Sequence, residues 1–344
     1  MAKRKLSRQQ QRRITSTQKT KIVDVLQLDE SRSRVARVIS HHGRELFAEV
    51  ESLDDISKEK KHEKLKCKIR QNLGEIACGD FVIVQQALNA TGESQNVVVA
   101  VKDRLNLLKK TGFAGAIKPV AANIGQVVIV TSIKPKPNPY LIDRYLASTE
   151  SMPAQALIVI NKIELMDQET RPLVDDLTHL YRNIGYKVIA TSMKHGTGLD
   201  ELSDALSNTT SILVGLSGVG KSSIVKNILP KEAIKIGATS EATGEGKHTT
   251  TVSALYHLKC NGIIIDSPGV RDFTPISTSI DEITNGFIDV RKFSGVCKFS
   301  NCSHHHEPGC ALKQAVADGK LSEQRFKNYL RMLQEYNEKT RAEN

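Results

Sequence analysis

The chain has 344 residues, more than one compact core usually holds, so we expect two or three domains. Lysine and arginine outnumber aspartate and glutamate by 49 to 38, and the net charge of +11 points to a phosphate-rich partner, although a basic surface also serves solubility. No run of about 18 apolar residues is present, and no apolar segment follows the basic N-terminus. We therefore expect a cytoplasmic protein with no membrane partner.

Residues 1–32 are too polar and too basic to bury a core, which predicts a flexible tail. The early cations are Lys3, Arg4, Lys5, Arg8, Arg12 and Arg13. Such a tail suits a nucleic-acid backbone, and the alternative is a solvated tail without a partner.

Residues 33–110 contain short alternating apolar segments separated by turn or charged residues, which predicts five strands and a small closed β-barrel. The expected strands are 35–39, 46–50, 65–70, 81–85 and 96–101. Barrels of the oligonucleotide-binding kind bind nucleic acid on one face, and a purely scaffolding barrel is the alternative. Because aromatic residues are scarce, we expect contacts to backbone and shape rather than to bases.

The sequence pattern is different in residues 111–280. After an expected linker through 111–119, short apolar runs typical of buried strands alternate with segments whose apolar residues recur at helical spacing. The expected strands are 126–131, 156–161, 187–191, 211–214 and 262–266, and the expected helices are 141–148, 173–183, 199–207 and 223–229. This alternation predicts a mostly parallel sheet with helices on both faces.

Residues 215–222 read G-x-x-x-x-G-K-S between a predicted strand and a predicted helix, which is a phosphate loop. Its glycines let backbone N–H groups face phosphates, Lys221 would reach the outer phosphates, and the Ser222 hydroxyl would hold Mg²⁺. The predicted nucleotide contacts here are Gly215, Leu216, Ser217, Gly218, Val219, Gly220, Lys221, Ser222 and Ser223. The alternative is a glycine-rich turn that matches by chance.

A second set of residues expected to lie near the phosphates follows the phosphate loop in the sequence. Asp266 ends a buried strand before Ser-Pro-Gly, where a carboxylate would organise Mg²⁺ and the Gly269 amide would sense the terminal phosphate. Between loop and strand lies a Gly-containing segment with a threonine run, from which Thr250 is the first and Thr249 the second candidate for completing the Mg²⁺ shell. The alternative is that these threonines simply begin a β-strand.

A base-reading motif precedes the loop instead of following it. Asn161, Lys162 and Glu164 follow a buried strand, and a carboxylate at this place accepts hydrogen bonds from both N–H groups of the guanine edge. Glu164 stands where Asp is usual, and an accidental surface turn is the alternative. Ser192, at the end of the next strand, is expected to contact the base through its backbone.

Residues 281–344 combine a cysteine and histidine cluster with amphipathic helices. Cys297, Cys302 and Cys310 with one histidine supply three thiolates and an imidazole, which predicts a closed structural Zn²⁺ site. His304, His305 and His306 are all candidate donors. A stripe of Phe326, Tyr329, Leu330, Leu333 and Tyr336 predicts helix packing rather than a partner groove.

The motif order, Asn-Lys-x-Glu, Thr-Ser, phosphate loop, threonine switch and Asp-x-Pro-Gly, resembles a circularly permuted GTPase. With a barrel before it and a Cys/His segment after it, the chain over about 33–335 resembles the RsgA/YjeQ family of small-ribosomal-subunit assembly GTPases. The resemblance implies an oligonucleotide-binding barrel at 33–110, a permuted GTPase domain at 111–280 and a helical zinc-binding domain at 281–344. It also implies GTP and GDP as ligands, Mg²⁺, one structural Zn²⁺ whose histidine is His304, and the small subunit and its rRNA as partners of a monomer.

Catalysis needs a group that orients the attacking water, and Val270 stands where Ras-like enzymes carry glutamine. An aliphatic side chain cannot orient water, so we expect a low intrinsic rate. His248 is the best internal candidate, alongside Lys221 for phosphate charge and Thr250 for the switch, although His248 could simply be exposed. Two other functions stay open: an RNA-binding module with nucleotide as a structural ligand, and a phosphate-loop ATPase or kinase.

Overall fold

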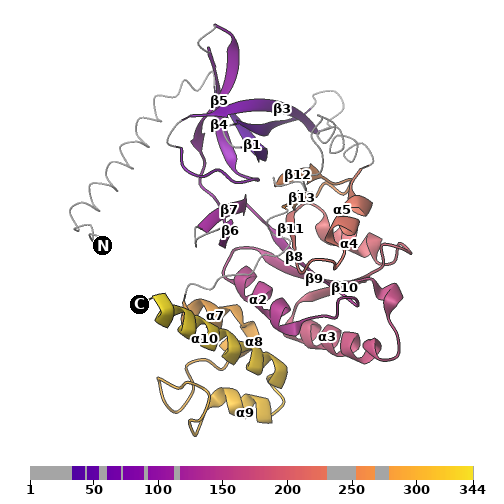
Figure 1. The fold of residues 1–344 in the computed structure, drawn as a ribbon, viewed down its shortest axis with the longest axis vertical. Helices are drawn as coiled ribbons and strands as arrows, with labels where there is room; N and C mark the ends of the chain where they lie inside the picture. The colour runs from indigo at the N-terminus through magenta and orange to yellow at the C-terminus, as the bar shows by residue number, and fades with distance from the viewer. Residues whose placement is uncertain are drawn as a thin grey trace, which may run out of the picture. The chain divides into compact units, whose positions relative to one another are not determined.

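The structure is a computed structural model that describes residues 33–42, 45–53, 60–70, 73–88, 92–111, 117–230, 253–267 and 279–343. Its contacts divide the chain into two compact units, Met1–Ile76 with Asp80–Asp103 and Ala77–Gly79 with Arg104–Asn344 (Figure 1).

The first unit is a closed five-stranded β-barrel. Its strands are β1 (Ser33–His42), β2 (Glu45–Leu53), β3 (Lys60–Ile69), β4 (Phe81–Leu88) and β5 (Ser94–Val101). They follow the order β1-β2-β3-β5-β4, and β4 pairs back with β1 to close the barrel. All pairings are antiparallel except β3 with β5. Inward side chains such as Val38, Leu46 and Val82 are fully buried, and the predicted barrel is confirmed.

The segment expected to be a linker, 111–119, overlaps two paired strands at its ends. Strands β6 (Leu107–Thr111) and β7 (Ile117–Ala122) pair antiparallel within the second unit. Pro119 has no N–H to donate, and the register shifts between Leu108 and Lys109. A proline within a strand weakens the sequence signal for that strand, and the expectation of a linker was wrong at Thr111 and at 117–119; residues 112–116 lie outside the described residues.

The second unit is built on a mostly parallel sheet, as predicted. Its strands follow the order β10 (Lys187–Thr191), β9 (Gln155–Asn161), β8 (Gln126–Ser132), β11 (Thr210–Val214), β13 (Ile263–Asp266) and β12 (Ala254–His257). Only β12 runs antiparallel to its neighbour β13. Every residue of β8 is buried, so this strand is covered on both faces.

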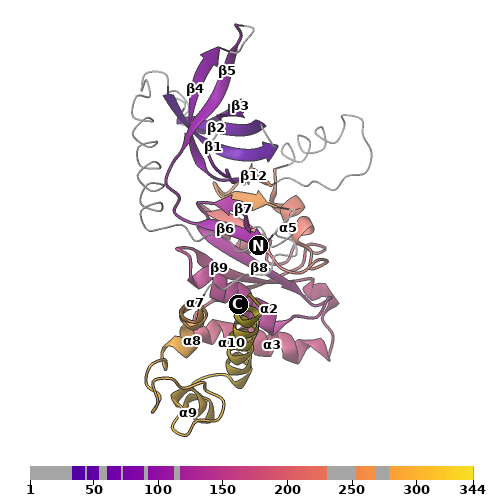
Figure 2. The same cartoon turned by 60° about the vertical axis from the view of Figure 1, so that its left-hand side comes forward.

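Helices cover both faces of this sheet (Figure 2). On one face, α4 (Leu199–Leu206) and α5 (Lys221–Ile228) pack Leu202 and Ile224 against Val128 and Leu157. Elsewhere α2 (Pro139–Glu150) packs on β8 and β9, and α3 (Thr170–Ile184) packs on β10. All four predicted helices are confirmed.

The C-terminal part of the second unit is helical. Helices α7 (Ile280–Gly286), α8 (Ile288–Arg291), α9 (Ala311–Ala317) and α10 (Glu323–Glu343) share a core with α2. The predicted stripe on α10 packs into that core, so its expected role in packing is confirmed. Within the described ranges, no helix combines the length and the apolar character needed to cross a membrane.

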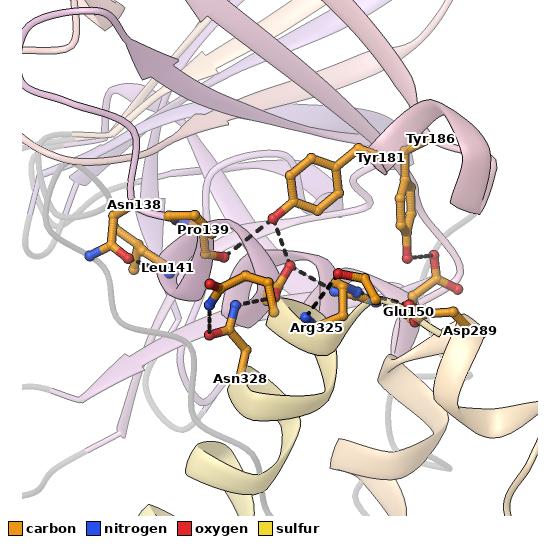
Figure 3. A network of polar contacts seen from close by, with 12 residues as sticks. Asn138, Pro139, Leu141, Glu150, Tyr181, Tyr186, Asp289, Arg325 and Asn328 are labelled. Carbon is orange, nitrogen blue, oxygen red and sulfur yellow. Dashed lines mark hydrogen bonds and ion pairs between the residues drawn. The ribbon is translucent and has the colours of Figure 1, made fainter. Parts of the chain in front are cut away.

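A buried ionic network fastens these C-terminal helices to α2 (Figure 3). The Arg325 side chain is fully buried, and it donates to Asp143 on α2 at 2.7 Å and to Asp289 on α8 at 2.6 and 3.1 Å. Asn328 and Tyr181 also donate to the Asp143 carboxylate, at 2.6 and 2.8 Å. Burial alone would lower the pKa of Arg325, but Asp143 and Asp289 outweigh it and hold that pKa above its ordinary value.

We expect Arg325→Met to destabilise the protein by about 3–5 kcal/mol, because it leaves two buried carboxylates without their cation. The matched control is Lys327→Met on the same helix, where the 64% exposed lysine pairs with Glu323 at the surface and should change stability much less, because solvent screens the pair. Chemical denaturation followed by circular dichroism measures both. Equal, small losses for the two variants would contradict a structural role for the network.

Candidate nucleotide and metal sites

The loop between β11 and α5 has a backbone that only glycine accommodates at its two ends. Gly215 has φ of 138°, and a Cβ there would lie 2.1 Å from the Val130 carbonyl oxygen. Gly220 has φ of 98°, and a Cβ there would lie 2.3 Å from the Asn161 amide nitrogen. The glycines therefore set the loop close against β8 and β9 and direct it into the first turn of α5.

Lys221 lies at the start of α5, only 8% exposed. Its Nζ donates to the carbonyl oxygens of Gly215 and Leu216, each at 2.6 Å, so the loop curls around the ammonium. A backbone loop wrapped around one cation at the N-terminal end of a helix is suited to an anion.

The two residues predicted for Mg²⁺ end up on neighbouring elements. Ser222 is exposed in the first turn of α5, directly after the loop that follows β11. Asp266 is the last residue of β13, which pairs parallel with β11 through Ile212 and Ile265. Because parallel strands end at the same edge of a sheet, hydroxyl and carboxylate lie on the same side of it, and both are hard oxygen donors of the kind Mg²⁺ prefers.

Asn161 and Lys162 join the end of β9 to the phosphate loop. The Asn161 amide donates to the Val219 carbonyl oxygen at 3.0 Å, and the Thr191 hydroxyl donates to the Asn161 Oδ1 at 3.1 Å. Lys162 Nζ donates to the carbonyl oxygens of Gly218 at 2.5 Å and of Lys134 at 2.8 Å. The sequence predicted Asn161 and Lys162 as base contacts but gave no sign that they also hold the loop or that Lys134 takes part.

We call the hydrogen bonds from Asn161 and Lys162 to the phosphate-loop carbonyls the loop brace. Glu164, next to them in the sequence, presents an acceptor oxygen that lacks a donor. Its Oε2 is buried and has no hydrogen-bond partner within the part of the chain that the structure describes. Hydrogen bonding from the Ser192 side chain lowers the pKa of Glu164, which keeps the carboxylate ionised. Ser192 itself is 1% exposed, and its backbone N–H donates to the Thr197 carbonyl oxygen at 3.0 Å. A buried ionised oxygen without a donor favours a ligand that supplies N–H groups.

Four predicted residues lie outside the described residues: His248, Thr249, Thr250 and Gly269. The other predicted nucleotide and Mg²⁺ residues lie together at one edge of the sheet, at the carboxyl ends of β9, β10, β11 and β13 or in the segments that directly follow them. They are Asn161, Lys162, Glu164, Ser192, Lys221, Ser222, Ser223 and Asp266, with the rest of the phosphate loop.

Cys297, Cys302, His304 and Cys310 form a cluster whose four donor atoms all lie within 4.8 Å of one another. His304 Nδ1 lies 3.7 Å from the Cys297 Sγ and 3.4 Å from the Cys310 Sγ. A tetrahedral Zn²⁺ with ordinary bond lengths would separate a nitrogen and a sulfur donor by about 3.6 Å. The donor set and its spacing therefore fit a closed Zn²⁺ site, and His304 supplies the imidazole in place of His305 or His306.

Glu307 shapes the loop that carries this cluster, and the sequence did not single it out. Its carboxylate accepts from the backbone N–H groups of Ser303 at 2.9 Å and His306 at 3.1 Å. His304 has φ of 64°, a left-handed conformation that the tight turn imposes. The Ala311 N–H adds a hydrogen bond to the Cys297 sulfur at 3.4 Å.

Comparison with known proteins gives consistent matches over nearly the whole chain. The protein named small ribosomal subunit biogenesis GTPase RsgA from Saccharophagus degradans is 40% identical, covering 97% of each chain. The protein of the same name from Marinobacter nauticus is 38% identical over the same shares. Among solved structures, YjeQ from Thermotoga maritima has a TM-score of 0.66 at 31% identity, covering 88% of this chain and 98% of its own.

A second solved structure, YloQ, is described as a circularly permuted GTPase, and it matches with a TM-score of 0.65 at 28% identity. The match covers 91% of this chain and 98% of YloQ. The family model described as RsgA GTPase matches residues 101–275, which include the whole of the base-reading and phosphate-loop constellation. The chain therefore belongs to the RsgA GTPase family.

Proposed function

We propose that this protein hydrolyses GTP to GDP in late maturation of the small ribosomal subunit. The subunit stimulates this hydrolysis, and hydrolysis controls the binding of the protein to the subunit and its release. The observation that carries the nucleotide part is the buried Oε2 of Glu164, which has no donor among the described residues and lies in the motif that braces the phosphate loop.

Guanine is the base that satisfies this oxygen. Its edge offers two adjacent N–H donors to a carboxylate, whereas adenine presents an acceptor there and would leave the Glu164 Oε2 without a donor. Asn161, Lys162 and Glu164 would hold the base, with the Ser192 backbone beside it. We propose these residues and the loop at 215–223 as the GTP and GDP site.

The phosphate side of the site supports in-line attack of water on the γ-phosphate. Lys221 would exchange its two loop carbonyls for phosphate oxygens and neutralise their charge. Ser222 and Asp266 would hold Mg²⁺, which screens the phosphate charge when bound. We keep Thr250, then Thr249, as the switch residues, Gly269 as the phosphate sensor, and His248 as the group that orients water.

The assignment to the small subunit rests on the family and on the architecture around the GTPase core. The curated relatives carry small-subunit biogenesis in their names. In this chain a closed barrel precedes the core, a basic tail precedes the barrel, and the net charge is +11. We propose contacts with rRNA for the barrel at 33–110 and the tail at 1–32, a GTPase domain at 111–280, a zinc domain at 281–344, and a cytoplasmic monomer.

The proposal is tested by single-turnover GTP hydrolysis with and without purified small subunits, with large subunits as the control. We expect small subunits to raise the rate by more than about tenfold, as stabilisation supplied by a partner does in other GTPases. Large subunits should leave the rate unchanged. No stimulation by small subunits would contradict the proposed function.

We expect Glu164→Ala to lower the affinity for GDP by about 100-fold, because the guanine N–H groups then lose their charged acceptor. Discrimination against ADP should shrink by a similar factor. The matched control, Glu169→Ala, removes an exposed carboxylate five positions later and should change neither quantity. Competition binding with a fluorescent GDP analogue measures both, and unchanged base preference in Glu164→Ala would favour an ATPase or a kinase instead.

We expect the purified protein to contain about one Zn²⁺ per chain, held by Cys297, Cys302, His304 and Cys310. Cys310→Ser should lose the metal and lower the melting temperature, since metal binding contributes directly to folding. Cys260→Ser, outside the cluster, should keep both. Elemental analysis and thermal melts with and without a chelator are the measurements. Purified protein without stoichiometric Zn²⁺, or a melting temperature that the chelator leaves unchanged, would refute the site.

A further inference from the structure

Residues 133–138 join β8 to α2 and run alongside the phosphate loop, and we call them the β8–α2 loop. Pro135 lies beside Gly218, where a Cβ would approach the proline Cδ to 3.9 Å. Lys136 lines a small cavity together with Gly215 and Leu216. The β8–α2 loop therefore borders the phosphate loop along its exposed part, 216–218.

Hydrogen bonds fix the backbone of the β8–α2 loop on both sides of Pro135. The Ser132 hydroxyl donates to the Pro135 carbonyl oxygen at 3.2 Å, and Lys162 Nζ donates to the Lys134 carbonyl oxygen at 2.8 Å. Lys136 stands between two prolines, and a proline restricts the backbone of the residue before it. A lysine on such a restrained backbone loses less conformational freedom when it binds an anion.

The ammonium group of Lys136 is available to a ligand. The Lys136 side chain is exposed, and within the described ranges it forms no ion pair and no hydrogen bond. In contrast, the ammonium groups of Lys162 and Lys221 each donate to two backbone carbonyl oxygens. Lys136 is thus a cation beside the phosphate loop that no protein group engages among the residues described.

The position of Lys221 indicates which phosphate Lys136 would meet. The Lys221 ammonium lies 2.6 Å from the carbonyl oxygens of Gly215 and Leu216, and in phosphate loops this lysine reaches the β- and γ-phosphates. Lys136 lines its cavity with the same two residues. Asp266, the proposed Mg²⁺ ligand, ends β13 on the other side of β11 from β8. Lys136 therefore lies toward the γ-phosphate end of the loop, on the side away from the proposed Mg²⁺.

We infer that Lys136 binds the γ-phosphate of the nucleotide and makes the site prefer a triphosphate to a diphosphate. The inference rests on the proposed GTP site and adds to it a residue that the phosphate-loop motif does not contain. The γ-phosphate brings negative charge to this end of the loop that a diphosphate lacks, so a cation here attracts the triphosphate more strongly. Because Lys136 is exposed, salt should weaken this preference.

Lys136→Gln in the full chain should weaken the binding of a non-hydrolysable GTP analogue by about fivefold and that of GDP by less than about twofold, as expected of one charge contact in solvent. Lys136→Arg keeps the charge and should keep the preference. The matched control is Lys226→Gln, which removes an exposed lysine from the last turn of α5, outside the cavity lining, and should change neither affinity. Competition against a fluorescent GDP analogue measures each affinity.

Equal losses of affinity for the GTP analogue and for GDP in Lys136→Gln, or no loss for either, would overturn the inference while leaving nucleotide binding intact. A loss of preference as large in Lys226→Gln would also overturn it, because net charge alone would then explain the effect. Unmodified protein that binds neither nucleotide would contradict the proposed function itself, and the inference with it.

Discussion

The hydrogen bonds that Asn161 and Lys162 donate to the phosphate-loop carbonyls hold the whole candidate site together. They join residues 58 and 56 positions apart in the sequence, and they do so across the β9, β8 and β11 neighbours of the parallel sheet. Gly220 makes the approach possible, since any Cβ would occupy the place of the Asn161 amide. Because the sheet sets these distances, the order of the motifs along the chain can be permuted without changing the site.

A second connection runs from the base-reading residues to the C-terminal helices. Lys162 donates to the Lys134 carbonyl, a few residues before α2 begins, and α2 carries the Asp143 that Arg325 binds. Arg325 in turn lies on α10, which also carries Tyr329, whose ring centre lies 6.1 Å from that of His304 in the candidate zinc cluster. The predicted base-contacting residues and the C-terminal helices therefore belong to one packed body, and we propose it as the route by which nucleotide occupancy affects residues 279–343.

Sequence patterns predicted the elements of this fold well because the barrel strands alternate with period two and the core strands are continuous apolar runs. They missed two strands whose local signal is weak. Strand β12 has only four residues, and β7 contains Pro119, which is unusual within a strand. Arg325 also escaped prediction, since it lies among the charged residues of α10 that normally face solvent. Its burial depends on Asp143 and Asp289, which are 182 and 36 positions away, and no local pattern encodes that partnership. Likewise, the sequence motif predicted that Asn161 contacts the base, but it did not predict the hydrogen bond to the Val219 carbonyl, which depends on how the sheet brings the two segments together.

The most direct test of the loop brace is the binding of tripolyphosphate, a ligand that has phosphates but no base. Asn161 belongs to the predicted base-reading motif, and tripolyphosphate has no base. If Asn161 nevertheless supports the phosphate loop, Asn161→Ala should weaken tripolyphosphate binding by about tenfold, which corresponds to one net hydrogen bond. Glu164→Ala, which removes only a base acceptor, should leave this affinity unchanged. Calorimetric titration that found Asn161→Ala equal to the unmodified protein, or both variants equally weakened, would contradict the brace.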